Sequence, residues 1–109
     1  MKPIIFLGDS LDRLRDFPND ARAVTGFQLD RVQRGMDPGD WKPMKTIGPG
    51  VREIRVREAS GAFRVIYLAT LPKAVYVLHA FRKTTQATNR HDIALAAARL
   101  RTLENTNEQ

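Results

Sequence analysis

The sequence predicts an α+β fold in which helices flank an antiparallel sheet. Apolar residues recur at helical spacing in segments near both ends of the chain, and three consecutive segments of strand-like sequence joined by short turns lie in the middle. With 109 residues, 42% of them hydrophobic and 28% charged, the chain has the size and composition of a folded protein rather than of a disordered one. We therefore expect a single domain that spans residues 1–109.

The first third of the chain predicts one short strand and two helices. Residues 4–7 (IIFL) are bounded by a proline and a glycine, which is typical of a short strand. Asp9 and Ser10 are good helix caps, and apolar residues follow at helical spacing as far as Pro18, where a short helix should end. Proline fits the first turn of a helix and glycine often ends one, so a second helix is expected from Pro18 to Gly35. The stripe expected to face the core consists of Ala21, Val24, Gln28, Leu29 and Val32. The two helices form a hairpin whose apolar faces pack inward.

The middle of the chain predicts a three-stranded antiparallel meander. In residues 51–58 the apolar Ile54 and Val56 alternate with charged residues, as in a strand with one face in water. The charged residues of this alternation are Glu53, Arg55 and Arg57. Residues 63–68 and 75–81 follow after short turns and are apolar on both faces, so we expect them at the centre of the sheet.

Two segments complete the prediction. Residues 35–50 contain several prolines and glycines, which favours an irregular connection. After a polar stretch, residues 90–103 have apolar positions at helical spacing and predict a C-terminal helix packed on the sheet.

Composition limits the possible functions. The chain has 18 Lys and Arg against 12 Asp and Glu, a formal charge of +6, which favours nucleic acid first and an acidic protein segment second as partners. A generally basic surface is the alternative interpretation. No cysteine is present, which excludes a disulfide framework, a thiolate metal site and a cysteine nucleophile. The apolar run at residues 3–7 is too short for a membrane span or a signal peptide, so the protein is expected in the cytoplasm.

Motifs for common cofactor and nucleophile chemistry are missing from the sequence. There is no GxSxG, no Walker A sequence, no GxGxxG and no pair of histidines at a helical metal-binding spacing. We therefore expect neither a metal nor a cofactor.

Cations concentrate on the predicted strands. They are Arg52, Arg55, Arg57, Arg64, Arg82 and Lys83. Arg55 and Arg64 share one patch if the registers of their strands agree, and because opposed like charges repel, such a patch favours an anionic ligand. The alternative is a solvated face on which Glu53 and Glu58 balance the arginines.

Four segments in this order resemble the phage-related RelE/HigB-type toxins of bacterial toxin-antitoxin pairs. They are residues 42–45 (KPMK), 50–55 (GVREIR), 63–67 (FRVIY) and 76–84 (YVLHAFRKT). The resemblance covers essentially the whole chain. It implies a RelE-like fold in which the helical hairpin covers one face of a twisted antiparallel sheet and the other face forms a shallow basic groove.

The resemblance also implies a function. Such toxins are metal-independent endoribonucleases that use the 2′-hydroxyl of the RNA as nucleophile and often cut messenger RNA at the ribosome. A cognate helix-turn-helix antitoxin, which neutralises the toxin and binds operator DNA to repress the operon, is implied as the partner.

The requirements of this reaction assign roles to the strand cations. Attack by the 2′-hydroxyl builds negative charge on the phosphate oxygens, which Arg64 and then Arg55 would bind, and Lys83 would stabilise or protonate the leaving oxygen. Glu53 and His79 are the candidates for the general base, although His79 also fits a structural role. Five further cations are expected to bind RNA: Lys42, Lys45, Arg52, Arg57 and Arg82.

Departures from the pattern leave alternatives open. Thr88 and Asn89 stand where several members of the family carry an aromatic or imidazole group. The chain could therefore be a catalytically silent module that binds nucleic acid or the ribosome, or an interaction protein whose groove holds an acidic partner segment. A structural role for Arg64 would require a carboxylate partner, Glu53 or Glu58.

Overall fold

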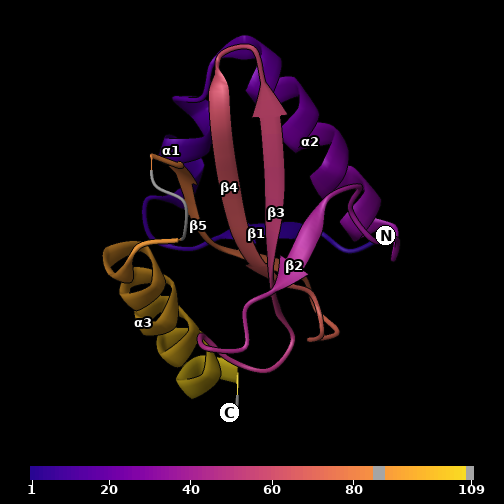
Figure 1. The fold of residues 1–109 in the computed structure, drawn as a ribbon. Helices are drawn as coiled ribbons and strands as arrows, with labels where there is room; N and C mark the ends of the chain where they lie inside the picture. Colours follow the sequence, from indigo (N-terminus) through magenta and orange to yellow (C-terminus); the bar gives the residue numbers. More distant parts are fainter. Residues whose placement is uncertain (85–87, 108–109) are drawn as a thin grey trace.

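The computed structural model describes residues 1–84 and 88–107. Five strands form one sheet in the order β1-β5-β4-β3-β2, with helices on its faces (Figure 1), which confirms the α+β prediction. In chain order the elements are β1 (Ile4–Phe6), α1 (Ser10–Arg15), α2 (Asn19–Gln33), β2 (Trp41–Pro43), β3 (Val51–Glu58), β4 (Gly61–Leu68), β5 (Val75–Arg82) and α3 (Arg90–Asn107). Residues 85–87 of the predicted polar stretch lie outside the described residues.

The second predicted helix ends where its sequence indicates. Gly35 has a φ of 82°, a conformation that costs glycine little, and its N–H donates to the carbonyl of Val32. The N–H of Met36 donates to the carbonyl of Arg31 at 2.9 Å. This pair of bonds satisfies carbonyls that the helix end would otherwise leave free, so Gly35 stops α2 as expected.

The two faces of the sheet carry separate apolar clusters. Phe63, Val65 and Tyr67 of β4 point to the face covered by α1 and α2, which we call the hairpin face. Ile66 and Leu68 point to the opposite face, which we call the α3 face, where α3 and the segment after β2 pack. Because α3 lies at the end of the sheet away from the β3–β4 turn, it covers only part of this face (Figure 1). The part of this face nearer that turn is thus left uncovered by α3.

The sheet is mixed rather than purely antiparallel. The β3-β4-β5 meander is antiparallel as predicted, but β1 pairs with β5 in parallel, with Ile4 opposite Val75. Parallel strands need a long connection, and two helices and three strands lie between β1 and β5 in the chain. The hairpin signals in the sequence describe only strands joined by short turns, so they did not predict this pairing.

The prediction of an irregular segment at residues 35–50 was wrong at one place. Trp41, Lys42 and Pro43 form β2, and Trp41 lies opposite Ile54 of β3. As β2 is an edge strand, Pro43 costs no bond to a further strand. The density of prolines and glycines concealed this short pairing.

Both central strands are apolar on two faces because each face of the sheet carries a buried apolar cluster. The β4–β5 ladder also contains an irregularity, which decides where the last residues of β5 point. His79 lies opposite Ile66, but Tyr67 lies opposite Val77, so Leu78 is an extra residue in β5. Such a bulge changes which face the following residues take. His79 and Phe81 consequently point to the α3 face.

Candidate nucleic-acid interface

The register of β3 and β4 brings the two predicted phosphate-binding arginines together. Arg55 lies directly opposite Arg64 on the α3 face, so the register allows the two arginines to share one patch. Lys42 lies opposite Glu53 on the same face, and the N–H of Lys83 continues the ladder by donating to the carbonyl of Ala62 at 2.8 Å. We call the resulting surface the basic face. It consists of Lys42, Glu53, Arg55, Arg57, Arg64 and Lys83.

Arg64 and Glu53 form a buried ion pair in the floor of the basic face. The Nε of Arg64 lies 3.4 Å from Oε1 of Glu53, and the two residues are 2% and 0% exposed. Arg64 also donates from Nη1 to the carbonyl of Phe63 at 3.0 Å. Glu53 therefore supplies the carboxylate that a structural role for Arg64 requires. The expected wet face of β3 was wrong at Glu53, because residues from outside the strand cover this carboxylate.

Two further groups surround Glu53. The hydroxyl of Thr88 donates to Oε2 at 2.6 Å, and Nζ of Lys42 lies 3.9 Å from Oε1. Among the described residues, Oε1 has no partner aligned for a hydrogen bond, which leaves one acceptor oxygen among cations. A carboxylate in this position can accept a proton.

Burial and mutual repulsion affect the charges of the basic face. Burial lowers the pKa of Arg64 below its usual value, and the charges of Arg55 and Arg57 lower it further against the attraction of Glu53. Burial also lowers the pKa of Lys83, with Arg64 as the strongest charge acting on it. A lysine with a lowered pKa gives up its proton more readily than a free lysine.

His79 lies beneath α3. It is 0% exposed, and its Nε2 is 2.7 Å from Oδ1 of Asp92 in the first turn of α3. Burial lowers the pKa of His79, whereas Asp92 opposes this shift. Arg99 adds a second attachment of α3, since it donates to the carbonyl of Leu78 at 2.9 Å and to Asp9 at 2.6 Å. The candidate base His79 is thus enclosed at the helix contact.

Two of the predicted RNA-binding residues lie on the hairpin face. Arg52 pairs with Asp37 at 2.8 Å and lies 3.9 Å above the ring of Trp41. Arg82 donates to the carbonyl of Ser60. Both therefore belong to the face opposite Arg55 and Arg64.

Lys45 remains near the basic face. It is exposed after β2 and lines an open depression of about 500 Å³ together with Lys42 and Thr88. Glu53 lies next to this depression, because two of the residues that line it, Lys42 and Thr88, contact the Glu53 carboxylate.

The sequence analysis did not predict the structural roles of three polar residues. Asp92 holds His79, Thr88 binds Glu53, and Tyr67 places a hydroxyl in the core with no hydrogen-bond partner among the described residues. Only Tyr67 offered a signal, because a phenol in a largely apolar strand needs a partner for its hydroxyl.

The family comparison covers four of the five strands and most of the helices described above. Residues 12–101 match the family described as Phage derived protein Gp49-like (DUF891). The chain belongs to this family. Gp49-like proteins are toxin-like members of the RelE/ParE superfamily. The matched segment includes every residue of the basic face and excludes β1. No curated protein matches the chain.

Two negative findings apply to the described part of this Gp49-like chain. Within residues 1–84 and 88–107, no three His, Cys, Asp or Glu side chains lie together so as to hold a metal ion. In the same part, no helix has the length and apolar character needed to cross a membrane.

Proposed function

We propose that this Gp49-like protein is the toxin of a type II toxin-antitoxin pair and cleaves messenger RNA as a metal-independent endoribonuclease of the RelE/HigB type. One observation carries the proposal: Arg55 and Arg64 are directly opposed across the β3–β4 ladder. Opposed like charges destabilise a sheet, and an anion bound between them removes this cost. RNA phosphate is the anion that fits a basic protein of a toxin-like family.

The basic face offers a group for each step of the proposed reaction. Glu53 accepts the proton of the 2′-hydroxyl as that oxygen attacks the neighbouring phosphorus. Arg55 and Arg64 stabilise the charge that builds on the phosphate oxygens. Lys83, whose pKa is lowered, donates a proton to the departing 5′ oxygen. The bond from phosphorus to the 5′ oxygen breaks, and a cyclic phosphate remains on the other fragment.

The substrate and partner in this proposal derive from family membership and charge. Messenger RNA at the ribosome is the substrate, and Arg57, Lys42 and Lys45 bind its neighbouring phosphates. The partner is a helix-turn-helix antitoxin with an acidic or amphipathic element, because a formal charge of +6 attracts such a segment.

The test is cleavage of a labelled RNA by purified variants of confirmed fold, on ribosomes and free in solution. Arg55→Ala and Lys83→Met should each lower cleavage by about 10²-fold, the scale for loss of one preorganised group. Arg22→Ala, which removes an exposed arginine of α2, is the matched control and should cleave normally. Equal cleavage by all three variants would refute the assignment of the basic face.

A second candidate function, a catalytically silent module that binds RNA or the ribosome, is favoured by the burial of the central pair. Arg64 and Glu53 are 2% and 0% exposed, so a substrate must displace covering groups to reach them. Arg64→Lys keeps the charge but loses the two-pronged donor arrangement. Wild-type protein that binds RNA without cutting it on or off ribosomes, and an Arg64→Lys variant that binds equally well, would favour the silent module.

A further inference from the structure

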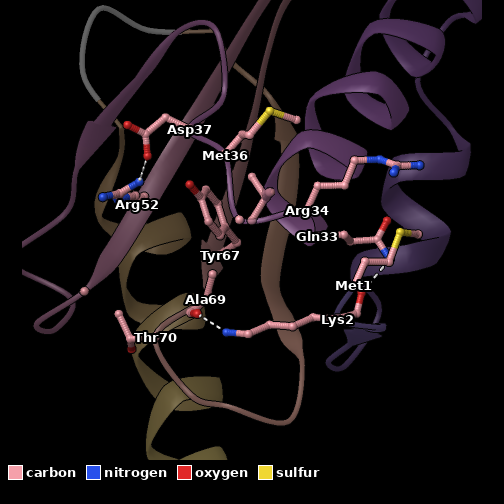
Figure 2. A pocket seen from close by; sticks show the side chains of 13 residues that line it. Met1, Lys2, Gln33, Arg34, Met36, Asp37, Arg52, Tyr67, Ala69 and Thr70 are labelled. Atoms are coloured by element: carbon pink, nitrogen blue, oxygen red, sulfur yellow. Dashed lines mark hydrogen bonds and ion pairs between the residues drawn. The ribbon is translucent and has the colours of Figure 1, made fainter.

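The hairpin face contains a pocket that the proposed chemistry does not use. Its volume is about 610 Å³, and it lies between the end of α2, the first residues of the chain and the strands β3 and β4. Figure 2 shows the ring of Tyr67 standing in this pocket between Arg52 and Arg34, with its hydroxyl on the side of the Arg52–Asp37 pair. Tyr67 points to the face opposite Arg64, so the pocket and the basic face are separated by the sheet.

The Tyr67 hydroxyl is a buried polar group whose hydrogen-bonding capacity is unused. Tyr67 is 1% exposed, and its oxygen has no hydrogen-bond partner among the described residues. Burial raises the pKa of this hydroxyl, so the phenol is neutral. The guanidinium of Arg52, which pairs with Asp37, lies close enough to act in the opposite direction on that pKa but does not meet the geometry of a hydrogen bond to the hydroxyl. A buried hydroxyl without a partner is unfavourable, and a ligand that supplies one gains a hydrogen bond.

The charges of the lining favour an anion. Lys2, Arg34 and Arg52 line the pocket, against the single carboxylate of Asp37. Asp30 pairs with Arg34 beside the rim at 2.9 Å, which still leaves positive charge in excess.

Apolar groups form the remainder of the wall. They include Val32 of α2, Met36 after it and Ala69 after β4, while the ammonium group of Lys2 is fixed on the carbonyls of Ala69 and Leu71 at 2.6 and 2.8 Å. Such a wall suits an apolar side chain rather than a run of phosphates.

We propose that this pocket binds an acidic peptide segment of a partner protein, with one apolar side chain inside, a peptide group on the Tyr67 hydroxyl and a neighbouring carboxylate at Arg34. Under the proposed function, on which this identification rests, the segment belongs to the antitoxin. A few buried anchors carry most of the affinity of such contacts. Because the pocket lies across the sheet from the basic face, the segment holds the toxin without covering Arg55.

The test is a titration of isotope-labelled protein with acetylated, amidated hexapeptides, followed by NMR. Three acidic peptides carry one leucine, phenylalanine or tryptophan among glutamates, and three matched peptides carry lysines in place of the glutamates. The acidic peptides should shift signals of Val32, Tyr67 and Ala69, and the lysine peptides should not. Absence of pocket shifts with all three acidic peptides, or shifts centred on Arg55, would overturn the proposal.

Tyr67→Phe is the sharpest variant. It deletes only a hydroxyl that has no partner in the free protein, so thermal stability should be unchanged or slightly higher. The affinity for the peptide should nevertheless fall by about fivefold, the value of one hydrogen bond. Unchanged affinity would overturn the role of the hydroxyl.

The charge at the rim has a matched control. Arg34→Glu and Arg13→Glu each reverse an exposed arginine that pairs with an aspartate four residues earlier. Arg34→Glu should lower the affinity for the acidic peptide about tenfold, and Arg13→Glu should leave it unchanged. Equal effects of the two substitutions would refute the contact between the peptide and Arg34.

The titration contains no RNA, so it distinguishes this inference from the proposed function. Peptide binding without cleavage in the RNA assay would contradict the proposed function alone, whereas cleavage without peptide binding would contradict the pocket alone. An RNA oligonucleotide added to the complex should leave the pocket shifts in place. Its displacement of the peptide would refute the separation of the two surfaces.

Discussion

Removal of either member of the buried Arg64–Glu53 pair should destabilise the protein more than removal of both. The residues are 2% and 0% exposed, and a buried charge that loses its partner costs about 3–5 kcal/mol. Replacement of a whole buried pair by neutral groups often changes the free energy of unfolding little. The variants Arg64→Met and Glu53→Gln and their double variant therefore form an informative thermodynamic cycle.

The surroundings of the pair set the order of the two single variants. Arg64→Met leaves Glu53 with the Thr88 hydroxyl at 2.6 Å and Lys42 at 3.9 Å, so we expect a loss at the lower end, about 3 kcal/mol. Glu53→Gln leaves Arg64 opposite Arg55 with only the weaker attraction of Asp40, so we expect a loss of about 5 kcal/mol. The double variant should lose less than either.

Urea unfolding measures these losses. With a slope of about 1.5 kcal/mol per molar urea, a loss of about 3 kcal/mol lowers the midpoint by about 2 M. Arg34→Met breaks an exposed pair at 2.9 Å and, as the control, should cost less than about 1 kcal/mol. Single losses that add to within about 0.5 kcal/mol in the double variant would refute the coupling.

Three further predictions concern pH and metal. Burial lowers the pKa of His79 in the folded protein, so the unfolded chain binds the imidazole proton more readily. The free energy of unfolding should therefore fall as the pH drops below about 6.5. Urea unfolding at several pH values should show a flatter pH dependence for His79→Gln than for the wild type, and the same dependence in both would contradict this role of His79. Hydrogen bonds from Arg99 and Arg13 lower the pKa of Asp9 from 3.8 to about 2, so its carboxylate stabilises the fold above pH 3.8 and this contribution disappears as the pH falls toward 2. With the Asp9 side chain 45% exposed, the contribution is at most about 1 kcal/mol, and an Asp9→Asn variant with the acid unfolding curve of the wild type would argue against it. Cleavage of ribosome-free RNA should continue in EDTA, since the proposed groups are side-chain acids and bases; reproducible loss that an added metal restores would refute this mechanism.

The meander was predictable because its information is local. Alternation in residues 51–58 and the short turns specify neighbouring strands, whereas the register that pairs Arg55 with Arg64 comes from the structure. The pairing of β1 with β5 joins residues about seventy positions apart, such as Ile4 and Val75, and no local pattern encodes it.

The candidate site was predictable in its cations but not in its burial. Period-two alternation assigned Glu53 to a wet face, whereas Thr88 and Lys42, which approach from other parts of the chain, surround it. Which charges a fold encloses depends on such distant segments. Arg52, one residue before Glu53, faces Asp37 and Trp41 on the other side of the sheet because successive side chains of a strand alternate between its two faces.

The place of β5 between β1 and β4 has a consequence for synthesis of the protein. The first strand cannot complete its pairing until residues 75–77 have been made, and β4 is without its second neighbour until the same moment. The β3–β4 hairpin that carries Arg55 and Arg64 can form early, but it is supported on one side only during that interval. A chain that stops before β5 therefore lacks both the second neighbour of β4 and the attachment of its first strand. If the basic face is the active surface, activity cannot precede almost complete translation.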